Sequence, residues 1–363
     1  MKRATRAALR WLGTILLFLA VALCFAPTTV PPFLDRLYYE GPASAHYDGE
    51  RFFNPDGAAP ASRGRRNFLS RWTGSRERAQ WPDRVPVRPT VPPRRVEGDE
   101  MRVTWIGHAT VLVQTQGLNI LTDPIWSERA SPFAFIGPRR VRAPGIRFDD
   151  LPKIDLVLIS HNHYDHMDLP TLKRLWRRDR PLIVTSLGND TIVAGAGAQA
   201  VARDWGGRVP VRPGVEAIVE RNHHWGSRWF TDRNRALWSA FTVRLPAGNI
   251  FFAGDTGWGD GGWVREAARH GPFRLAIIPI GAYEPRDFMR THHIDPGEAV
   301  AIFEALRPTR ALGVHWGTYQ LTFEGIDEPR RRLAALRRAR GIEPDRFVAV
   351  EAGQGFAVPP LAR

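Results

Sequence analysis

Cysteine is almost absent from the sequence, and Cys24 is the only one in 363 residues. A single cysteine cannot form a disulfide within the chain, and cysteine-based zinc fingers need several thiolate ligands. Both kinds of stabilisation are therefore excluded. If the protein binds a metal ion, histidine and carboxylate side chains must hold it.

Lysine is nearly as scarce. Of the 51 basic residues, only Lys2, Lys153 and Lys173 are lysines, and the other 48 are arginines. The excess of basic residues over the 37 acidic ones gives a net charge of +14. A chain this basic can bind nucleic acid, or anionic lipid and phosphate groups. The arginines are spread along the chain, however, with no RNA-recognition signature and no basic recognition helix. We therefore expect no nucleic-acid partner.

The N-terminus carries one long uncharged run, Trp11–Ala26, which follows four basic residues. A positive segment before an apolar core is the layout of a secretory signal. As a helix the run extends about 24 Å, somewhat short of a hydrocarbon layer of roughly 30 Å. Residues 1–26 are therefore predicted to be a transmembrane anchor, which we favour, or a cleaved signal peptide. Either places the rest of the chain on the extracytoplasmic (periplasmic) side, membrane-anchored or secreted.

The remaining chain has two parts of different composition. Residues 27–100 are rich in Pro and Arg, with five prolines between residues 82 and 93. Proline fixes φ and lacks an amide donor, so this part is predicted to be an extended arm that runs over a surface. Residues 101–363 alternate short apolar runs with amphipathic stretches, and they are predicted to form one compact domain.

The apolar runs of this domain predict strands at 102–106, 111–115, 119–122, 156–160, 182–185, 215–219, 237–245, 250–253, 275–280, 311–315 and 347–350. Helices are predicted at 169–178, 262–269, 296–306 and 328–340. Many strands with interspersed helices favour an α/β sandwich.

The segment from Ser160 to His166 reads Ser-His-Asn-His-Tyr-Asp-His and directly follows an apolar strand. In extended backbone, residues i and i+2 project to the same side, so His161 and His163 can converge on one ion. If the chain turns after them, Asp165 and His166 can face a second ion. Imidazole and carboxylate ligands suit zinc, with manganese or iron as alternative occupants. This density of ligand-type residues indicates a metal site rather than a polar loop.

Three later strings also place a ligand-type residue after a strand. His223 and His224 follow one strand, and either can be a third ligand of the first ion. Asp255 follows another, flanked by glycines that allow close backbone approach, and its carboxylate can bridge two ions. His315 ends a third. Each string alone is more typical of a loop residue, but their recurrence favours a dinuclear metal site.

The order of an HxHxDH string, a later histidine, a strand-ending aspartate and a last histidine resembles the metallo-β-lactamase superfamily. One branch is more similar still, the N-acylphosphatidylethanolamine-hydrolysing phospholipase D family. The resemblance covers roughly residues 100–355. The stretches that carry it are 104–110 (TWIGHAT), 121–127 (LTDPIWS), 129–132 (RASP), 137–138 (GP), 251–257 (FFAGDTG), 278–286 (IPIGAYEPR), 293–296 (HIDP) and 315–318 (HWGT).

Carried over by position, the resemblance implies a first metal ion and a second one, with a carboxylate bridging them. The implied ligands are His161, His163 and His224 for the first ion, Asp165, His166 and His315 for the second, and Asp255 as the bridge. His224 is preferred to His223 because the residue just before Trp225 matches the family's ligand.

Further residues are implied to act beside the ions. His293 matches a family histidine that lines the substrate site, and Asp165, Asp255 and His293 are the implied catalytic residues. His108 and Asp123 match family strings and are predicted to orient ligand side chains from behind. For Asp123, capping of the turn before the next proline is the alternative role.

The resemblance implies the four-layer αβ/βα metallo-β-lactamase sandwich, here with an N-terminal membrane segment, and residues 101–363 as the hydrolase domain. Two zinc ions would activate a water that attacks a phosphodiester in line and expels the alcohol. The predicted function is therefore zinc-dependent, phospholipase D-type hydrolysis of N-acylphosphatidylethanolamine-like phospholipids at a membrane. Arg139, Arg140 and Arg286 are candidate phosphate partners. Because the related phospholipase is dimeric, a homodimer is also implied.

Two departures from the family leave the substrate open. The N-terminal segment and arm fall outside the resemblance, and residues 138–147 do not match the family's lipid-contacting loop. A different phospholipid or a smaller phosphodiester is thus a second possible substrate. Because the same activated water can attack a carbonyl, a lactonase or another carbon-centred metallohydrolase is a competing function. A non-catalytic lipid-binding protein on this fold is a third.

Overall fold

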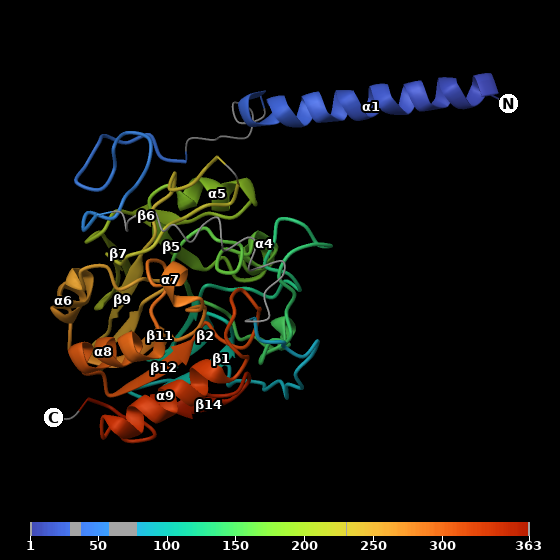
Figure 1. Cartoon of the computed structure of the whole chain (residues 1–363). Helices are drawn as coiled ribbons and strands as arrows, with labels where there is room; N and C mark the ends of the chain where they lie inside the picture. Colours follow the sequence, from blue (N-terminus) through green and yellow to red (C-terminus); the bar gives the residue numbers. More distant parts are fainter. Residues whose placement is uncertain (1, 30–37, 58–77, 230, 362–363) are drawn as a thin grey trace.

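The computed structural model describes residues 2–29, 38–57, 78–229 and 231–361 of the chain (Figure 1). The strands in these ranges are β1 (Met101–Gly107), β2 (Thr110–Thr115), β3 (Leu118–Thr122), β4 (Leu156–Ile159), β5 (Leu182–Ser186), β6 (Val201–Arg203), β7 (Arg208–Arg212), β8 (Val215–Glu220), β9 (Ala240–Arg244), β10 (Asn249–Phe252), β11 (Phe273–Pro279), β12 (Arg310–Val314), β13 (Phe347–Val348) and β14 (Gly355–Ala357). The helices are α1 (Lys2–Thr29), the short 3₁₀ helix η1 (Phe148–Asp150), α4 (Leu169–Asp179), α5 (Asn189–Gly195), α6 (Gly262–Ala268), α7 (Arg286–Met289), α8 (Pro296–Leu306) and α9 (Glu328–Ala339).

The strands form two mixed sheets of seven strands each. Their orders are β14-β1-β2-β3-β4-β5-β6 and β13-β12-β11-β10-β9-β8-β7. In the first sheet β1, β2 and β3 form an antiparallel meander, and β4, β5 and β6 continue in parallel from β3. The second sheet repeats this plan, with β7 to β10 antiparallel and β10 to β13 parallel. The predicted strands are thus present, with β6, β7 and β14 in addition.

Alternating side chains on the strands explain why the sheets stack into layers. On β4, Leu156 and Leu158 join the core between the two sheets, whereas Val157 and Ile159 point to the opposite face. There they pack with residues of α4 such as Leu172 and Leu175. Strands buried on both faces are the expected form of a sheet that is covered by helices on one side and by a second sheet on the other.

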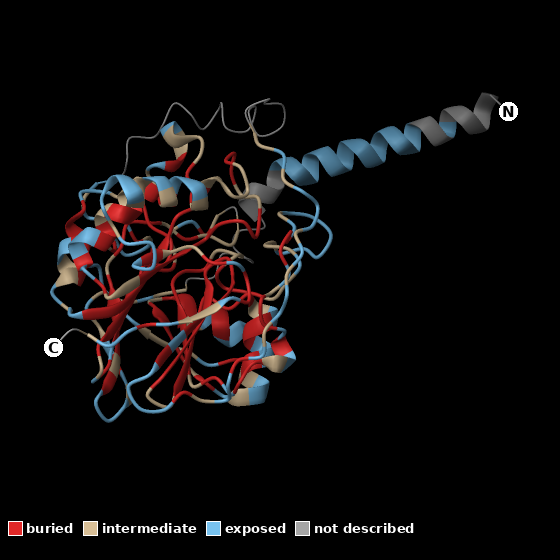
Figure 2. Cartoon of the chain, turned by 90° about the horizontal axis from the view of Figure 1, so that it is seen from below, coloured by how far each residue is buried: buried red, intermediate tan, exposed pale blue. Residues whose placement is uncertain are grey.

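Helices cover the outer faces of both sheets. Helix α5 packs on β5, while α8 packs on β11 and against α6 and α9. The start of α8 is fixed by a capping box in which Asp295 accepts the Glu298 amide and the Glu298 side chain accepts the Asp295 amide. Buried segments run through the sheets in Figure 2, with exposed residues on the outer helix faces. The predicted αβ/βα sandwich is therefore present.

The N-terminal segment forms helix α1, which lies apart from the sandwich in Figure 1. The side chains described in it, from Trp11 to Cys24 among them, are exposed. Those of residues 1–6, 8, 9, 25 and 26, which belong to the predicted signal or anchor, lie outside the described residues. In the part of the chain that the structure describes, no helix combines the length and apolar character needed to cross a bilayer, so the predicted membrane segment lacks structural support.

The predicted arm differs in part from its expected surface course. Tyr47 and Phe52 are buried and pack with Leu237 and Trp238 in a core cluster of their own. Aromatic side chains in this stretch offer enough apolar surface to favour burial, which the proline-based prediction did not weigh. Residues 30–37 and 58–77 of the predicted arm lie outside the described residues.

Candidate metal centre

The predicted metal ligands and the two orienting residues lie at one end of the strands that precede them, whereas His293 lies between α7 and α8. His108 follows β1, Asp123 follows β3, residues 160–166 follow β4, His224 follows β8, Asp255 follows β10, and His315 follows β12. The two sheets meet there, as two hydrogen bonds between them show. The His315 amide donates to the His108 carbonyl at 3.0 Å, and the Ser239 amide donates to the Ser160 carbonyl at 2.9 Å. Residues that are far apart in the sequence thus share one edge of the sandwich.

Local backbone geometry turns several of these side chains into the site. His108, Asp123 and His315 have positive φ values of 55°, 31° and 63°. This left-handed region is uncommon for residues with a side chain and often marks functional positions. Gly254 has φ +60°, and a Cβ there would lie 2.6 Å from the Ser160 Cβ, so a side chain would separate the ends of β10 and β4. The predicted need for glycine before Asp255 is confirmed.

The first group of ligand-type atoms consists of His161, His163 and His224, whose candidate atoms lie within 4.8 Å of one another. His161 Nε2 and His163 Nδ1 are 2.7 Å apart. His224 donates from Nδ1 to the His292 carbonyl at 2.8 Å, and its buried Nε2 has no hydrogen-bond partner. The carbonyl therefore fixes the tautomer that leaves Nε2 available as a ligand.

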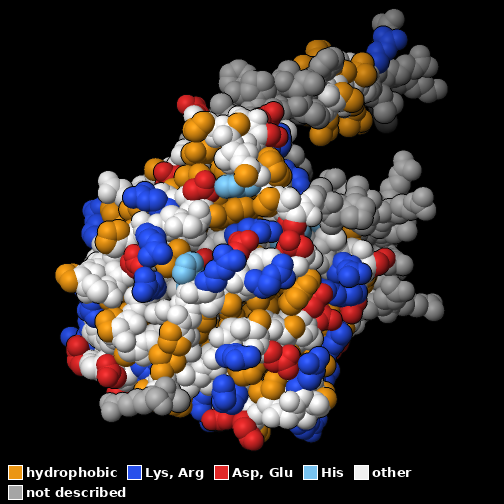
Figure 3. All heavy atoms as spheres, turned by 90° about the vertical axis from the view of Figure 1, so that its left-hand side faces the viewer, with side chains coloured by type: hydrophobic (Ala, Val, Ile, Leu, Met, Phe, Trp, Pro, Cys, Tyr) orange, Lys and Arg blue, Asp and Glu red, His pale blue; other side chains and the backbone are white. Residues whose placement is uncertain are grey.

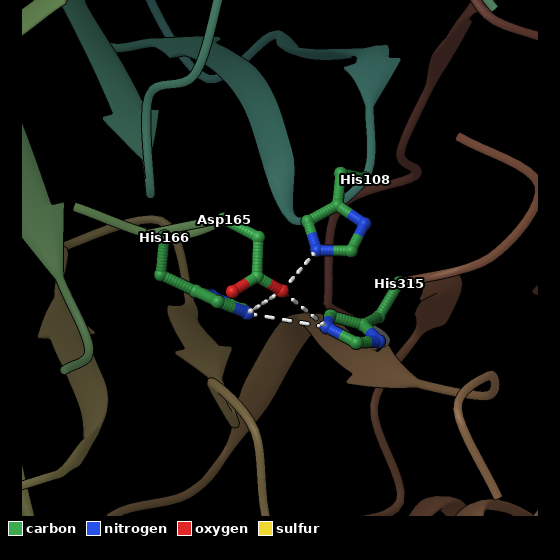
Figure 4. A group of neighbouring side chains, drawn as sticks. All are labelled: His108, Asp165, His166 and His315. Atoms are coloured by element: carbon green, nitrogen blue, oxygen red, sulfur yellow. Dashed lines mark hydrogen bonds and ion pairs between the residues drawn. The ribbon is translucent and has the colours of Figure 1, made fainter. Parts of the chain in front are cut away.

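The second group consists of His108, Asp165, His166 and His315 (Figure 4). The Nε2 atoms of His166 and His315 are 3.1 Å apart, and they lie 3.3 and 3.4 Å from Asp165 Oδ2. His108 donates from Nε2 to the same Asp165 oxygen at 2.8 Å. The four side chains point toward one another and come from three loops, because Asp165 and His166 both follow β4. His108 holds Asp165 from behind, in the geometry expected for an orienting residue.

Asp255 lies between the two groups. Its Oδ2 is 3.0 Å from Nε2 of both His166 and His315, and it also forms a ligand-type cluster with His224 and His293. Its Oδ1 is buried without a hydrogen-bond partner. One carboxylate therefore reaches both the first and the second group, as a bridging ligand must.

Burial keeps the first group in the neutral form that binds metal. It lowers the pKa of His163 to about 4, and it lowers the pKa values of His161 and His224 well below the usual range. These imidazoles are therefore unprotonated at neutral pH, with lone pairs free for a cation.

The charged forms of Asp165, His315 and the neighbouring Asp255 are favoured instead. Burial would raise the pKa of Asp165 and of Asp255, but neighbouring imidazoles, His166 foremost, hold both well below the usual range. Burial would lower the pKa of His315, yet Asp255 and Asp165 raise it to about 9. Two buried, ionised carboxylates are thus stable only with positive charge beside them. Together with the partnerless nitrogen and oxygen atoms, this donor set fits two divalent cations with nitrogen and oxygen ligands.

Asp123 lies behind the second group. Its Oδ2 accepts from His166 Nδ1 at 2.6 Å and from the Ser160 hydroxyl at 2.5 Å, and its Oδ1 accepts the Ser160 amide at 2.7 Å. Ser160 Oγ is also 2.9 Å from His161 Nδ1, so one carboxylate supports both groups. These bonds match the predicted orienting role better than the alternative of capping the turn before Pro124.

His293 is buried beside the ligand cluster. Its Nδ1 lies 3.9 Å from Asp255 Oδ2 and has no hydrogen-bond partner, and burial lowers its pKa to about 3. His223, by contrast, turns away and bonds Asp56 at 2.8 Å. The choice of His224 over His223 thus agrees with the geometry.

The three candidate phosphate-binding arginines have other partners. Arg140 donates to the Ile125 and Ser127 carbonyls, Arg139 pairs with Glu128 on the surface, and Arg286 bonds Glu298 and the His293 carbonyl. Elsewhere on the surface, basic side chains are interleaved with acidic and apolar ones, as the face in Figure 3 shows. Arg286 acts on the site by holding the backbone of His293.

Sequence reasoning missed several supporting residues. Asn222 donates to the Ala253 and Asp255 carbonyls at 2.9 Å each, and its place just before the two histidines was a usable signal. Asn54, from the predicted arm, donates to the His224 carbonyl at 2.9 Å. Nothing in the sequence around Asn54 indicates this contact, because it depends on how the arm packs.

Known proteins resemble this chain over most of its length. A sequence profile described as the β-lactamase superfamily domain matches residues 118–316. N-acyl-phosphatidylethanolamine-hydrolyzing phospholipase D 1 of Caenorhabditis elegans is 37% identical over 75% of this chain and 82% of its own length. The mitochondrial enzyme of that description from Saccharomyces cerevisiae is 33% identical over 69% of this chain, but only 54% of its own length is matched.

Solved structures share the fold at lower identity. An isothiocyanate hydrolase from Delia radicum gut bacteria superposes with a TM-score of 0.56 at 18% identity, covering 71% of this chain and 100% of that one. At that identity the similarity shows the fold alone.

Proposed function

We propose that this chain, which belongs to the metallo-β-lactamase superfamily and is a metal-dependent hydrolase of that fold, cleaves phosphodiester bonds as a phospholipase D. Its proposed substrates are N-acylphosphatidylethanolamine-like phospholipids, and its proposed cofactors are two zinc ions. The observation that carries the proposal is the convergence of seven ligand-type residues from four loops. They are His161, His163, Asp165, His166, His224, Asp255 and His315.

Bound as a pair, divalent ions would supply a hydroxide nucleophile near neutral pH and neutralise the oxygens of a phosphodiester. The protein's own residues prepare the place for them. His161, His163 and His224 offer neutral imidazoles, and Asp165 with Asp255 offers the negative charge. Water attack at phosphorus breaks the bond to the headgroup oxygen, so the headgroup alcohol leaves and phosphatidic acid remains.

We assign His293 to the substrate rather than to an ion. Burial lowers its pKa to about 3, so its ring is neutral at working pH and carries a single N–H donor. Nδ1 has no protein partner, and in the tautomer that is protonated there it can donate to a phosphoryl or leaving-group oxygen. Because the His293 ring does not take up a proton near neutral pH, Asp165 or Asp255 is the better candidate to accept the proton of the attacking water.

The substrate proposal is supported by the relatives named as phospholipases and is tested by isotope labelling. The metal-replete full-length protein is incubated with N-acylphosphatidylethanolamine or ordinary phosphatidylethanolamine in ¹⁸O-water. Attack at phosphorus predicts ¹⁸O in phosphatidic acid and none in the released alcohol, with activity abolished by chelation. No headgroup release from either lipid would contradict the substrate class.

A carbon-centred hydrolase, such as a lactonase, is the second candidate. It is favoured by the shared fold of the isothiocyanate hydrolase and by a metal centre that can serve attack on a carbonyl equally well. A lactone and ester panel, assayed beside the phosphodiesters, separates the two. Two bound ions without turnover on either panel would instead favour a lipid-binding protein on this fold.

We further propose that residues 1–26 direct the hydrolase domain to the extracytoplasmic side, either held by that segment or secreted after its removal. The support is the basic start followed by the uncharged run Trp11–Ala26. N-terminal sequencing of the mature protein and protease treatment of spheroplasts test this. Protection of the domain in intact spheroplasts would contradict it.

A further inference from the structure

Residues 128–140 form a hairpin whose tip is uncharged and apolar. The Arg140 amide donates to the Glu128 carbonyl at 2.8 Å, the Ala130 amide to the Pro138 carbonyl at 3.1 Å, and Arg129 pairs with Arg139 in an antiparallel bridge. From Ala130 to Pro138 the sequence ASPFAFIGP has no charged residue. We call Phe133, Phe135 and Ile136 the hairpin tip.

The hairpin tip exposes large apolar side chains that a soluble surface rarely carries together. Phe133, Phe135 and Ile136 are 45%, 79% and 58% exposed, and the two phenyl rings contact each other with centroids 5.5 Å apart. Among the described residues outside α1, only two other large hydrophobic side chains are exposed, Phe53 and Val91. Exposed apolar side chains that cluster in this way mark an interaction site rather than scattered surface residues.

The base of this hairpin is joined to the metal centre. Tyr319 donates to the Ser127 carbonyl at 2.6 Å, and the Arg140 guanidinium stacks 4.9 Å above the Tyr319 ring. The Tyr319 ring in turn meets the His108 ring edge-on at 5.3 Å. His108 holds Asp165 of the second ligand group. Two side chains, Tyr319 and His108, therefore lie between the hairpin base and the candidate metal ligand Asp165.

We propose that the hairpin tip inserts into a bilayer of anionic phospholipid and docks the metal centre at its surface. The choice of partner rests on the proposed function, since a bilayer is where a phospholipid substrate resides. The geometry suits lipid: a strongly exposed, convex apolar tip fits fluid acyl chains without needing a complementary protein groove. Arg129 and Arg139 stand at its base, at the level of anionic headgroups, although Glu128 neutralises part of that charge.

The direct test is a label on the tip of the full-length chain. Cys24→Ser removes the only cysteine, and Phe135→Cys then carries an environment-sensitive fluorophore such as NBD. Val91→Cys, 69% exposed and outside the hairpin, is the matched control, with α1 present in both proteins. The probe is vesicles of phosphatidylcholine and phosphatidylglycerol that contain no N-acylphosphatidylethanolamine, so the outcome does not depend on catalysis.

The expected result is a blue shift and quenching by lipid-borne spin labels at position 135, none at position 91, and a weaker response with pure phosphatidylcholine. No shift at 135, or equal shifts at both positions, would overturn the proposal. So would a shift at 135 that needs no vesicles and grows with protein concentration, because that result would place a second copy of the chain on the tip.

A functional test separates docking from chemistry. Replacing Phe133, Phe135 and Ile136 together by serine should reduce hydrolysis of vesicle-held lipid about tenfold or more, because three apolar anchors are lost. Hydrolysis of soluble bis(p-nitrophenyl) phosphate should stay unchanged. Equal loss on both substrates would overturn docking as the role of the tip. If the unmodified protein hydrolyses neither substrate, the proposed function fails while the label experiment still decides docking.

Discussion

Asp123 Oδ2 lies 2.6 Å from His166 Nδ1, and both side chains are fully buried. The carboxylate can only accept this bond, so it fixes the ring orientation and leaves Nε2 facing Asp165 and Asp255. A carboxylate behind an imidazole also makes the ring a stronger ligand. The position of Asp123 therefore decides whether His166 can serve the second ion.

Asp123→Asn should weaken zinc binding at the second group by about 10–100-fold, because the amide loses the charge that supports His166. Metal content after dialysis against a weak chelator checks this. Asp149→Asn, which changes an exposed aspartate that pairs with Arg174 across 3.4 Å, is the control and should retain its metal. Unchanged binding in both variants would show that the Asp123–His166 bond is structural only.

Asp255→Asn should lose at least one metal equivalent and most turnover. Two cations placed side by side repel each other, and a shared carboxylate offsets this repulsion while a neutral amide does not. Metal content and turnover of the purified variant are measured beside those of the unmodified protein. Retention of two ions and near-normal turnover would refute the bridging assignment.

His293→Asn should keep both ions and lose rate. Its ring has no protein partner at Nδ1, so its removal leaves the ligands in place but deletes a donor toward substrate. The loss expected for one such group is about 10²-fold in turnover. The control is His46→Asn, which removes a histidine of the arm that pairs with Asp204. Loss of a metal ion in His293→Asn would reassign this residue to the ligand set.

Zinc binding should depend on pH differently at the two groups. Burial would lower the pKa of His315, but Asp255 and Asp165 raise it to about 9 in the metal-free protein, so zinc must displace a proton below that pH. The pKa of His163 is lowered to about 4, so the first group loses no proton on binding near neutrality. Between about pH 8 and about pH 6, affinity at the second group should fall by roughly tenfold per unit for each proton displaced. Competition titrations with a chelator measure this, and equal weakening at both groups would contradict it.

Asn54→Ala should weaken zinc at the first group. Asn54 donates to the His224 carbonyl, and its loss frees the loop that carries this ligand. One hydrogen bond of this kind contributes about 1 kcal/mol, or roughly fivefold in affinity. Phe53→Ala, which truncates the exposed neighbouring side chain, should have no effect on either ion. Equal zinc affinity in the two variants would mean that the arm does not support the site.

The sequence predicts those parts of the site that depend on local pattern. The HxHxDH string after β4 and the strand-ending positions of Asp255 and His315 are visible because apolar strands and polar loop residues alternate. The αβ/βα sandwich follows from strands such as β4 that are apolar on both faces. Short, weakly apolar strands such as β6, with a partly exposed Val201–Arg203, carry too little pattern to be predicted.

Contacts that depend on long-range packing could not be predicted in this way. The arm reaches His223 and His224 through Asp56 and Asn54, over separations of 167 and 170 residues. The predicted strand at 237–245 begins only at Ala240, because the Leu237 and Ser239 amides bond the Leu187 and Ser160 carbonyls beyond β5 and β4. These hydrogen bonds lie at the edge of the sandwich where the site is, and they are not part of the regular hydrogen bonding between neighbouring strands of a sheet.

The central claim is that one constellation of His and Asp side chains holds two ions that are both needed for phosphodiester hydrolysis. The most direct measurement strips metal from the full-length protein, adds zinc stepwise, and records bound zinc and headgroup release from N-acylphosphatidylethanolamine in the same samples. The account predicts negligible release in the stripped protein, a rise that requires the second equivalent, and saturation at two. Full release after exhaustive metal removal, or saturation at one equivalent, would contradict it.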